Sequence, residues 1–449
     1  MSVIRRLATC VVGLILISTI GAYAAPTRLI YFGRTRATEL AWAEDVAQKF
    51  SAMRPDVEVE VWASGTGGGS DYQEKLAVLT AAGTPPDVFL GLADKLGFIV
   101  KGFALDITPY VERDRAELQI NTFLPGVWES PSFQERQYGV PLSVTPQHLY
   151  YNRSLLLDRG LAPLPASWDD KSWTWERFLE YCRLLTVIGE QGHYEQLAVS
   201  QISEAKLPDI CYMFGGDWFK PEAYETGWAE RVTMTRPENV KAYEAVRDVY
   251  ARYAAAGPPK GISGVSGFLQ GRVAMDWIGA FRIGANFKEA RKKGEIAFEL
   301  AVGPVPLVEN RMNTRWTDPL FISTASKNPD LAWEFVKFAT DTESQELWTL
   351  YTGAMPARRS AIRTYIDGLT DVFDMSPNEI LSAMEGSVIH SVRSIEESIV
   401  EVPLEIARRF NEWITPILAG TVPVGNGLAT MEQALNAYIR QFNADMRTQ

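Results

Sequence analysis

The chain has 449 residues and a formal charge of −11, and it contains 13 tryptophans and 17 tyrosines. This acidic balance disfavours nucleic acids and anionic membranes as partners, because both repel negative charge. The length exceeds that of one ordinary hydrophobic core, so we expect two lobes. The three histidines, His148, His193 and His390, lie far apart without ligand-like spacing, and no metal site is predicted.

The first 25 residues have the pattern of a secretory signal peptide. A basic start, MSVIRR, precedes the apolar run VVGLILISTIGA, and AYAA offers a small-x-small cleavage pattern near Ala24 or Ala25. The apolar run is too short for a typical membrane span, although an uncleaved N-terminal anchor remains an alternative. Cleavage would remove Arg5 and Arg6 and lower the formal charge from −11 to −13. We therefore expect a periplasmic protein, with about 425 residues left to fold.

Strands and helices alternate at the start of this mature chain. Residues 27–34 and 57–62 have strand patterns, and apolar residues from Leu40 to Met53 recur at helical spacing between them. A second helix is predicted over 72–82, followed by a turn and a strand that begins at Asp87. This alternation indicates βαβ units and a largely parallel sheet.

The glycine-rich stretch ASGTGGGSDY, residues 63–72, lies between a predicted strand and a predicted helix. This setting is typical of nucleotide-binding loops. The fingerprint requires glycine or alanine where the chain has Ser70, and the carboxylate of Asp71 at a helix N-terminus would repel phosphate. We therefore expect a cleft loop without nucleotide, in which Ser70 and Asp71 either cap the helix or bind a ligand hydroxyl group.

The later elements follow the same local rules. An extended segment is predicted over 137–152, helices over 172–185 and 240–256, and a strand over 273–277. Another strand precedes a helix with Asn328 as its N-cap and Pro329 at its first position. For Cys182 and Cys211, a disulfide and two separate buried thiols both remain open. No phosphate-binding, nucleophile-elbow or zinc-protease motif occurs, so no catalytic residue and no cofactor is predicted.

Six segments, taken in chain order, resemble the extracellular solute-binding proteins of ABC importers, of the maltodextrin- and multiple-sugar-binding type. They are residues 43–61, 75–110, 138–170, 173–186, 268–281 and 323–361. The resemblance implies an α/β fold of the type II periplasmic-binding-protein kind, with two α/β lobes around a ligand cleft. It also implies a monomer that captures a carbohydrate and delivers it to ABC permease subunits in the membrane.

The resemblance further implies three hinge crossings between the lobes, near residues 143–146, 317–318 and 357–358. Lobe one would comprise residues 26–142 and 319–356. Lobe two would comprise residues 147–316 and 359–449.

Sugar binding requires aromatic faces against the sugar ring and planar polar groups around its hydroxyls, and such groups gather in loops after the carboxyl ends of strands. Trp277 falls where the family commonly places a stacking aromatic, and Asp94 where it often binds a hydroxyl. The full set of candidates is Arg34, Ser70, Asp71, Asp94, Gly215, Asp217, Trp277, Arg282, Arg315, Trp316 and Arg358.

Other ligands and functions remain open from the sequence. Four of the candidates are arginines, and bidentate arginine also suits an anionic ligand such as a glycerophosphate or an acidic sugar. A secreted carbohydrate-processing enzyme and a binding protein that docks a chemoreceptor are further alternatives.

Overall fold

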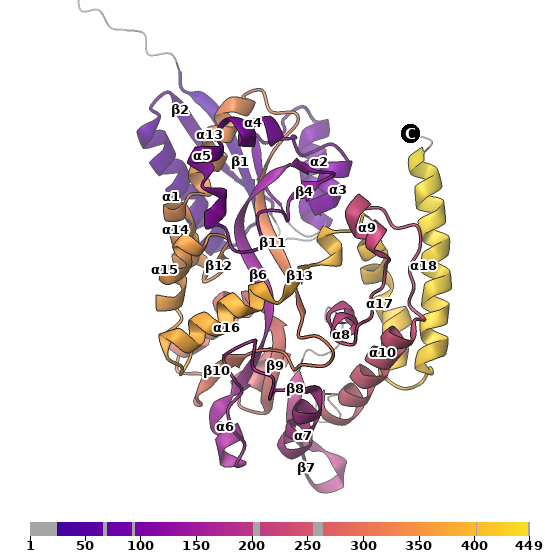
Figure 1. Ribbon diagram of the computed structural model, residues 1–449. Helices are drawn as coiled ribbons and strands as arrows, with labels where there is room; N and C mark the ends of the chain where they lie inside the picture. The colour runs from indigo at the N-terminus through magenta and orange to yellow at the C-terminus, as the bar shows by residue number, and fades with distance from the viewer. Residues whose placement is uncertain are drawn as a thin grey trace, which may run out of the picture.

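The computed structural model describes residues 25–65, 70–91, 95–200, 207–254, 264–400 and 402–447. The predicted signal peptide therefore lies outside the described residues, apart from Ala25. Two α/β lobes lie one above the other, connected by long central strands (Figure 1). Among the described helices, none is both long and apolar enough to cross a membrane.

The first lobe is built on parallel strands, as the alternating pattern predicts. Strand β1 pairs in parallel with both β2 and β3, and helix α1 packs on this layer. The elements of this lobe are β1 (Thr27–Gly33), α1 (Ala37–Met53), β2 (Val57–Ala63), α2 (Ser70–Ala81), β3 (Val88–Leu90), α3 (Lys95–Val100), α4 (Thr108–Arg113), α5 (Arg115–Leu118), η1 (Ile120–Thr122), β4 (Ser132–Phe133), β5 (Arg136–Gln137), α13 (Pro329–Ala339), α14 (Thr342–Thr352) and β12 (Met355–Pro356).

Two long strands, β6 (Gly139–Asn152) and β11 (Asn313–Ile322), run through both lobes (Figure 1). They pair antiparallel from Arg315 opposite Pro146 to Phe321 opposite Gly139, with a bulge between Asp318 and Pro319. The short β12 pairs with the same part of β6, at Val144 and Ser143. The chain thus passes between the lobes on adjacent strands, and the sheet is antiparallel here where the alternating pattern predicts mainly parallel pairing.

The second lobe continues the same sheet through β9 and β8, which pair in parallel. Its elements are α6 (Arg153–Asp158), α7 (Trp175–Leu185), β7 (Val187–Ile188), η2 (Glu190–Gly192), β8 (Tyr194–Ser200), α8 (Leu207–Met213), α9 (Pro221–Thr226), α10 (Pro237–Val249), η4 (Tyr250–Ala254), α11 (Gly264–Leu269), β9 (Val273–Gly279), η5 (Ile283–Phe287), α12 (Lys288–Lys292), β10 (Leu300–Gly303), α16 (Pro377–Ile389), β13 (Ser391–Arg393), η7 (Ile395–Glu397), α17 (Val402–Leu418) and α18 (Val424–Arg447). The elements η6 (Arg359–Ala361) and α15 (Ile362–Asp367) follow β12 and pack against α14 of the first lobe.

The hydrophobic core consists of two clusters of buried residues that pack against this continuous sheet. One buried cluster fills the first lobe and extends past the central strands, and a second fills the other side of the second lobe together with α17 and α18. Cys182 and Cys211 are both buried in the second cluster and are not joined by a disulfide. The disulfide alternative is therefore wrong, and burial holds the pKa of the Cys182 thiol well above its usual range.

Candidate functional site

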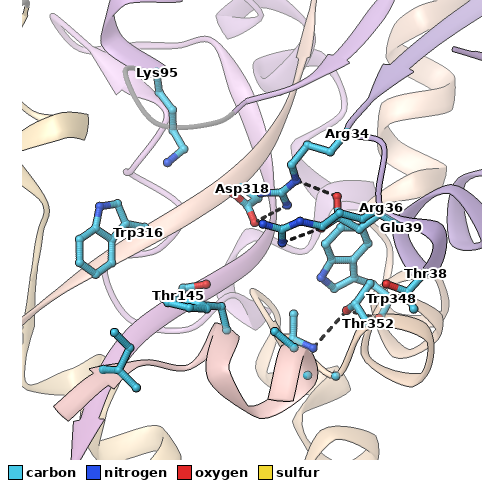
Figure 2. A pocket seen from close by; sticks show the side chains of 16 residues that line it. Arg34, Arg36, Thr38, Glu39, Lys95, Thr145, Trp316, Asp318, Trp348 and Thr352 are labelled. Atoms are coloured by element: carbon cyan, nitrogen blue, oxygen red, sulfur yellow. Dashed lines mark hydrogen bonds and ion pairs between the residues drawn. The ribbon is translucent and has the colours of Figure 1, made fainter. Parts of the chain in front are cut away.

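A cavity of about 570 Å³ lies between the two lobes, in front of the central strands (Figure 2). The first lobe lines it with the loop after β1, the starts of α1 and α3, and the end of α14. Thr145 of β6 and Trp316 and Asp318 of β11 form its back wall, and residues from Ile278 to Ala285 close it from the second lobe. This volume falls in the range of pockets that take small molecules.

Arg34 follows β1 directly and occupies one side of the cavity between two carboxylates (Figure 2). Its Nε lies 2.7 Å from Glu39 Oε2, and its Nη2 lies 3.2 Å from Asp318 Oδ2. Burial opposes the charge, but the Asp318 and Glu39 carboxylates raise the pKa of Arg34 above its usual value. Glu39 also accepts from Arg36, whose Nη1 lies 3.3 Å away. Both guanidinium groups are therefore paired with carboxylates.

Another ion pair connects the two lobes beside the cavity. Lys95, at the start of α3, pairs with Glu397 of η7, and the two side chains are only 2% and 0% exposed. Glu397 also accepts from the Thr317 backbone nitrogen at 2.6 Å and from the Thr317 hydroxyl at 3.2 Å. The neighbouring Glu396 accepts from the indole Nε1 of Trp316, and burial raises the pKa of the Glu396 carboxyl.

Apolar faces complete the cavity. Phe281, just after β9, is 48% exposed, which is unusual for so large an apolar ring. Half-buried Trp316 stands on the back wall, and the buried Trp348 and Ile278 contribute smaller surfaces. The site therefore combines aromatic faces with planar charged groups whose positions are fixed by pairing.

Two of the predicted site residues, Arg34 and Trp316, line this cavity. The loop 66–69, the side chains of Ser70 and Asp71, and Asp94 lie outside the described residues. The first turn of α2 lies at the carboxyl edge of the sheet, because the Tyr72 hydroxyl is within hydrogen-bond distance of the Phe32 and Leu90 carbonyl oxygens, at 3.1 and 2.8 Å.

Trp277 is not at the cavity, contrary to the stacking role predicted for it. Its side chain is fully buried in the second core cluster, with its ring edge-on to Phe178 at 6.2 Å. The physical reason is the two-residue period of a strand, which turns Ile278 toward the cavity and Trp277 toward the core. Arg282 is likewise outside the lining, with its Nε 3.2 Å from Asp276 Oδ2 and its Nη1 3.1 Å from Asn286.

The other predicted residues hold the fold together. Arg315 donates to the carbonyls of Ser391 and Gly126, and Arg358 to those of Thr340 and Leu118. Burial lowers the pKa of Arg315 and lowers that of Arg358 to about 10.

Gly215 and Asp217 belong to a turn of the second lobe, away from the cavity. Gly215 has a left-handed φ of +73° after α8, which suits glycine. Asp217 accepts from the Phe219 nitrogen at 3.0 Å and from the Tyr224 hydroxyl at 2.5 Å. Burial raises the pKa of the Asp217 carboxyl.

Sequence reasoning missed the groups that accompany Arg34 and Trp316. Asp318 is two residues from Trp316 on the same strand. Because side chains alternate between the two faces of a strand, both residues are expected on one face, and this rule could have predicted Asp318 as a site residue. Glu39 lies five residues after Arg34, within reach at the start of a predicted helix. Lys95 and Glu397 are 302 residues apart, and no local pattern indicates that they pair.

The arrangement suits binding rather than covalent chemistry. The aromatic faces can cover an apolar surface of a ligand, while the paired charges can accept or donate hydrogen bonds without changing protonation. Within the described part of the chain, no group of three or more histidine, cysteine, aspartate or glutamate side chains is placed to hold a metal ion.

Comparisons with known proteins agree on one family and one fold. Residues 35–346 match the family model of the bacterial extracellular solute-binding proteins. A diacetylchitobiose-binding protein of Streptomyces coelicolor is 22% identical over 333 residues, which is 73% of this chain and 72% of that protein.

Two solved structures show the fold over most of the chain. The sugar-binding protein MalE of Xanthomonas citri is 16% identical with a TM-score of 0.75, over 94% of this chain and 100% of that one. A Mycobacterium tuberculosis protein, UgpB, in complex with glycerophosphocholine is 17% identical with a TM-score of 0.71, over the same shares of the two chains. Two lobes around a cleft, as the sequence resemblance implied, are thus confirmed.

Proposed function

The chain belongs to the family of bacterial extracellular solute-binding proteins, and from this premise we propose that it captures a carbohydrate or polyol for an ABC importer. The proposal extends to the site: the ligand would lie in the cavity between Phe281 and Trp316 and the paired charges around Arg34. Hinge movement at residues 143–146, 317–318 and 357–358 would close the lobes around it, and the closed monomer would present it to permease subunits outside the cytoplasm.

One observation supports a neutral sugar as the ligand. An exposed aromatic ring shares the cavity with planar groups that are already neutralised in pairs. A sugar ring has an apolar C–H face for the aromatic ring and hydroxyls that both donate and accept, so it matches both features without bringing a charge.

The alternative of an anionic ligand rested on four arginines, and none of them supports it. Arg34 is paired with Glu39 and Asp318, and Arg282 with Asp276. The guanidinium groups of Arg315 and Arg358 bond to backbone carbonyls.

The proposal is tested by tryptophan fluorescence of the purified protein against a panel of neutral mono- and oligosaccharides and polyols, with native mass spectrometry to identify retained ligand. We expect at least one neutral saccharide to bind saturably. We also expect Phe281→Ala to weaken that binding about 2- to 10-fold, the range for loss of one aromatic contact. Tyr110→Ala, which removes a half-buried ring on α4 outside the cavity, is the matched control. A panel without binding, or an equal loss in both variants, would contradict the proposal.

A further inference from the structure

The charges around the cavity balance one another. Among the described residues that line it, the cationic side chains are Arg34, Arg36 and Lys95. Each has a carboxylate partner, since Glu39 serves both arginines, Asp318 adds a second contact to Arg34, and Glu397 pairs with Lys95. Each of the three cations thus has a carboxylate partner, and two of these carboxylates, Glu39 and Asp318, also line the cavity. The buried Glu396, next to Glu397, adds a fourth carboxyl group that bonds to Trp316, so the lining carries no excess positive charge.

The pair between Lys95 and Glu397 is the most deeply buried of these four ion-pair contacts. Arg36 is about half exposed and Asp318 is 20% exposed, so water screens part of their charge. Lys95 and Glu397 are almost completely buried, and a buried ammonium group without a partner is costly. Lys95 would therefore attract an anion strongly if its partner were absent.

Glu397 is also held in place independently of Lys95. The Thr317 backbone nitrogen and hydroxyl both donate to its carboxylate, at 2.6 and 3.2 Å. Because Thr317 belongs to β11 at the back of the cavity, this carboxylate is fixed where the ammonium group of Lys95 arrives from α3.

We propose that Glu397 is a specificity-determining residue, which cancels the charge of Lys95 and so makes the cavity select uncharged polyhydroxyl ligands over anionic ones. This inference rests on the proposed function, because it names the substrate class of that same site. It assigns the rejection of acidic and phosphorylated sugars to a residue that does not itself line the cavity.

The test measures anion binding directly. Wild type, Glu397→Gln, the double variant Lys95→Met with Glu397→Gln, and the control Asp367→Asn are titrated with inorganic phosphate and with D-glucuronate by calorimetry, at constant ionic strength. Asp367 pairs with exposed Arg363 on α15 and does not line the cavity, so its variant makes the same change of net charge outside the site. We expect Glu397→Gln to bind at least one of the two anions about tenfold or more tightly than wild type, the effect of roughly one uncompensated buried charge. The double variant and Asp367→Asn should resemble wild type.

Two results would overturn the inference: folded Glu397→Gln without any gain in anion affinity, or wild type that already binds either anion as tightly as that variant. If Glu397→Gln does not fold, Glu397→Asp shortens the same side chain, withdraws its carboxylate from Lys95, and should give a smaller gain of the same sign. No gain in folded Glu397→Asp would then overturn the inference. The anion titrations are read without any neutral sugar, so a failed saccharide panel contradicts the proposed function and leaves this comparison intact.

Discussion

We expect His148 to make the stability of the protein sensitive to acid. It lies on β6 and is fully buried, and within the described residues neither of its ring nitrogens has a hydrogen-bond partner. Its ring lies 5.6 Å from that of Tyr150. Burial lowers the pKa of His148 to about 3, because the charged imidazolium would lose its hydration without gaining a partner.

The sign and size of the effect follow from this lowered pKa. Above pH 6.5 the imidazole is neutral in the folded and the unfolded chain, so His148 adds no pH dependence. Between pH 6.5 and about 3 the unfolded chain binds a proton that the folded chain excludes, and the free energy of unfolding falls as the pH falls. The slope approaches 1.36 kcal/mol per pH unit, which amounts to about 2 kcal/mol at pH 5.

Urea unfolding at pH 7.5 and pH 5.0 tests this prediction on wild type, His148→Leu and His193→Gln. Carboxylates also titrate in this interval, so the informative quantity is the difference between variants in the stability lost. We expect His148→Leu to lose about 2 kcal/mol less than wild type between the two pH values. His193 is exposed, and its variant should lose as much as wild type. Equal losses in wild type and His148→Leu would refute the reasoning.

Three further predictions concern residues whose roles the structure separates. Arg358→Met should lower the free energy of unfolding by about 2–4 kcal/mol, because it leaves buried carbonyls unpaired, while ligand affinity of the folded protein stays unchanged by titration. Trp277→Phe should lower thermal stability, because the ring is fully buried in the core, and should leave ligand affinity unchanged. An affinity loss larger than that of Phe281→Ala would show that Trp277 contacts the ligand. Gly284→Ala should weaken ligand binding about 5-fold or more, because its Cβ would lie 2.0 Å from the Thr352 carbonyl oxygen across the lobes. Gly425→Ala, with open space around it, should leave binding unchanged.

Local patterns were sufficient for the elements of the first lobe. The expected strand, helix and strand from residue 27 to residue 62 appear as β1, α1 and β2 with boundaries that differ by a residue or a few. Asn328 is the N-cap of α13 as expected, although its side chain makes no capping bond. Such elements are fixed by neighbours in the sequence, which is why periodicity and capping rules find them.

Sheet direction and the strand face were harder to predict. Alternation of helices and strands indicates parallel pairing, but β6 and β11 each cross the molecule once and pair antiparallel with each other. The segment NTRWTDP, which was expected near a hinge crossing, lies on β11 where it pairs with β6, and its alternate residues have opposite roles. Trp316 and Asp318 line the cavity, while Arg315 bonds to backbone carbonyls on the other side. A one-residue error in assigning the face of a strand exchanges the binding and structural roles.

Whether a charged side chain at this site is compensated depends on ion-pair partners that are remote in the sequence. Arg34 meets Asp318 across 284 residues, and Lys95 meets Glu397 across 302. The number of arginines in the sequence suggests an anionic ligand. In the fold, however, the cationic side chains at the cavity are paired with carboxylates, so the cavity has no excess positive charge. The free energy of transferring an anion into such a site includes displacing a carboxylate from its cation, whereas a sugar hydroxyl can join the existing pair as an additional donor or acceptor. On the proposal above, the charge of the ligand is selected by ion pairs that form only when the chain folds, and composition and motifs do not encode these pairs.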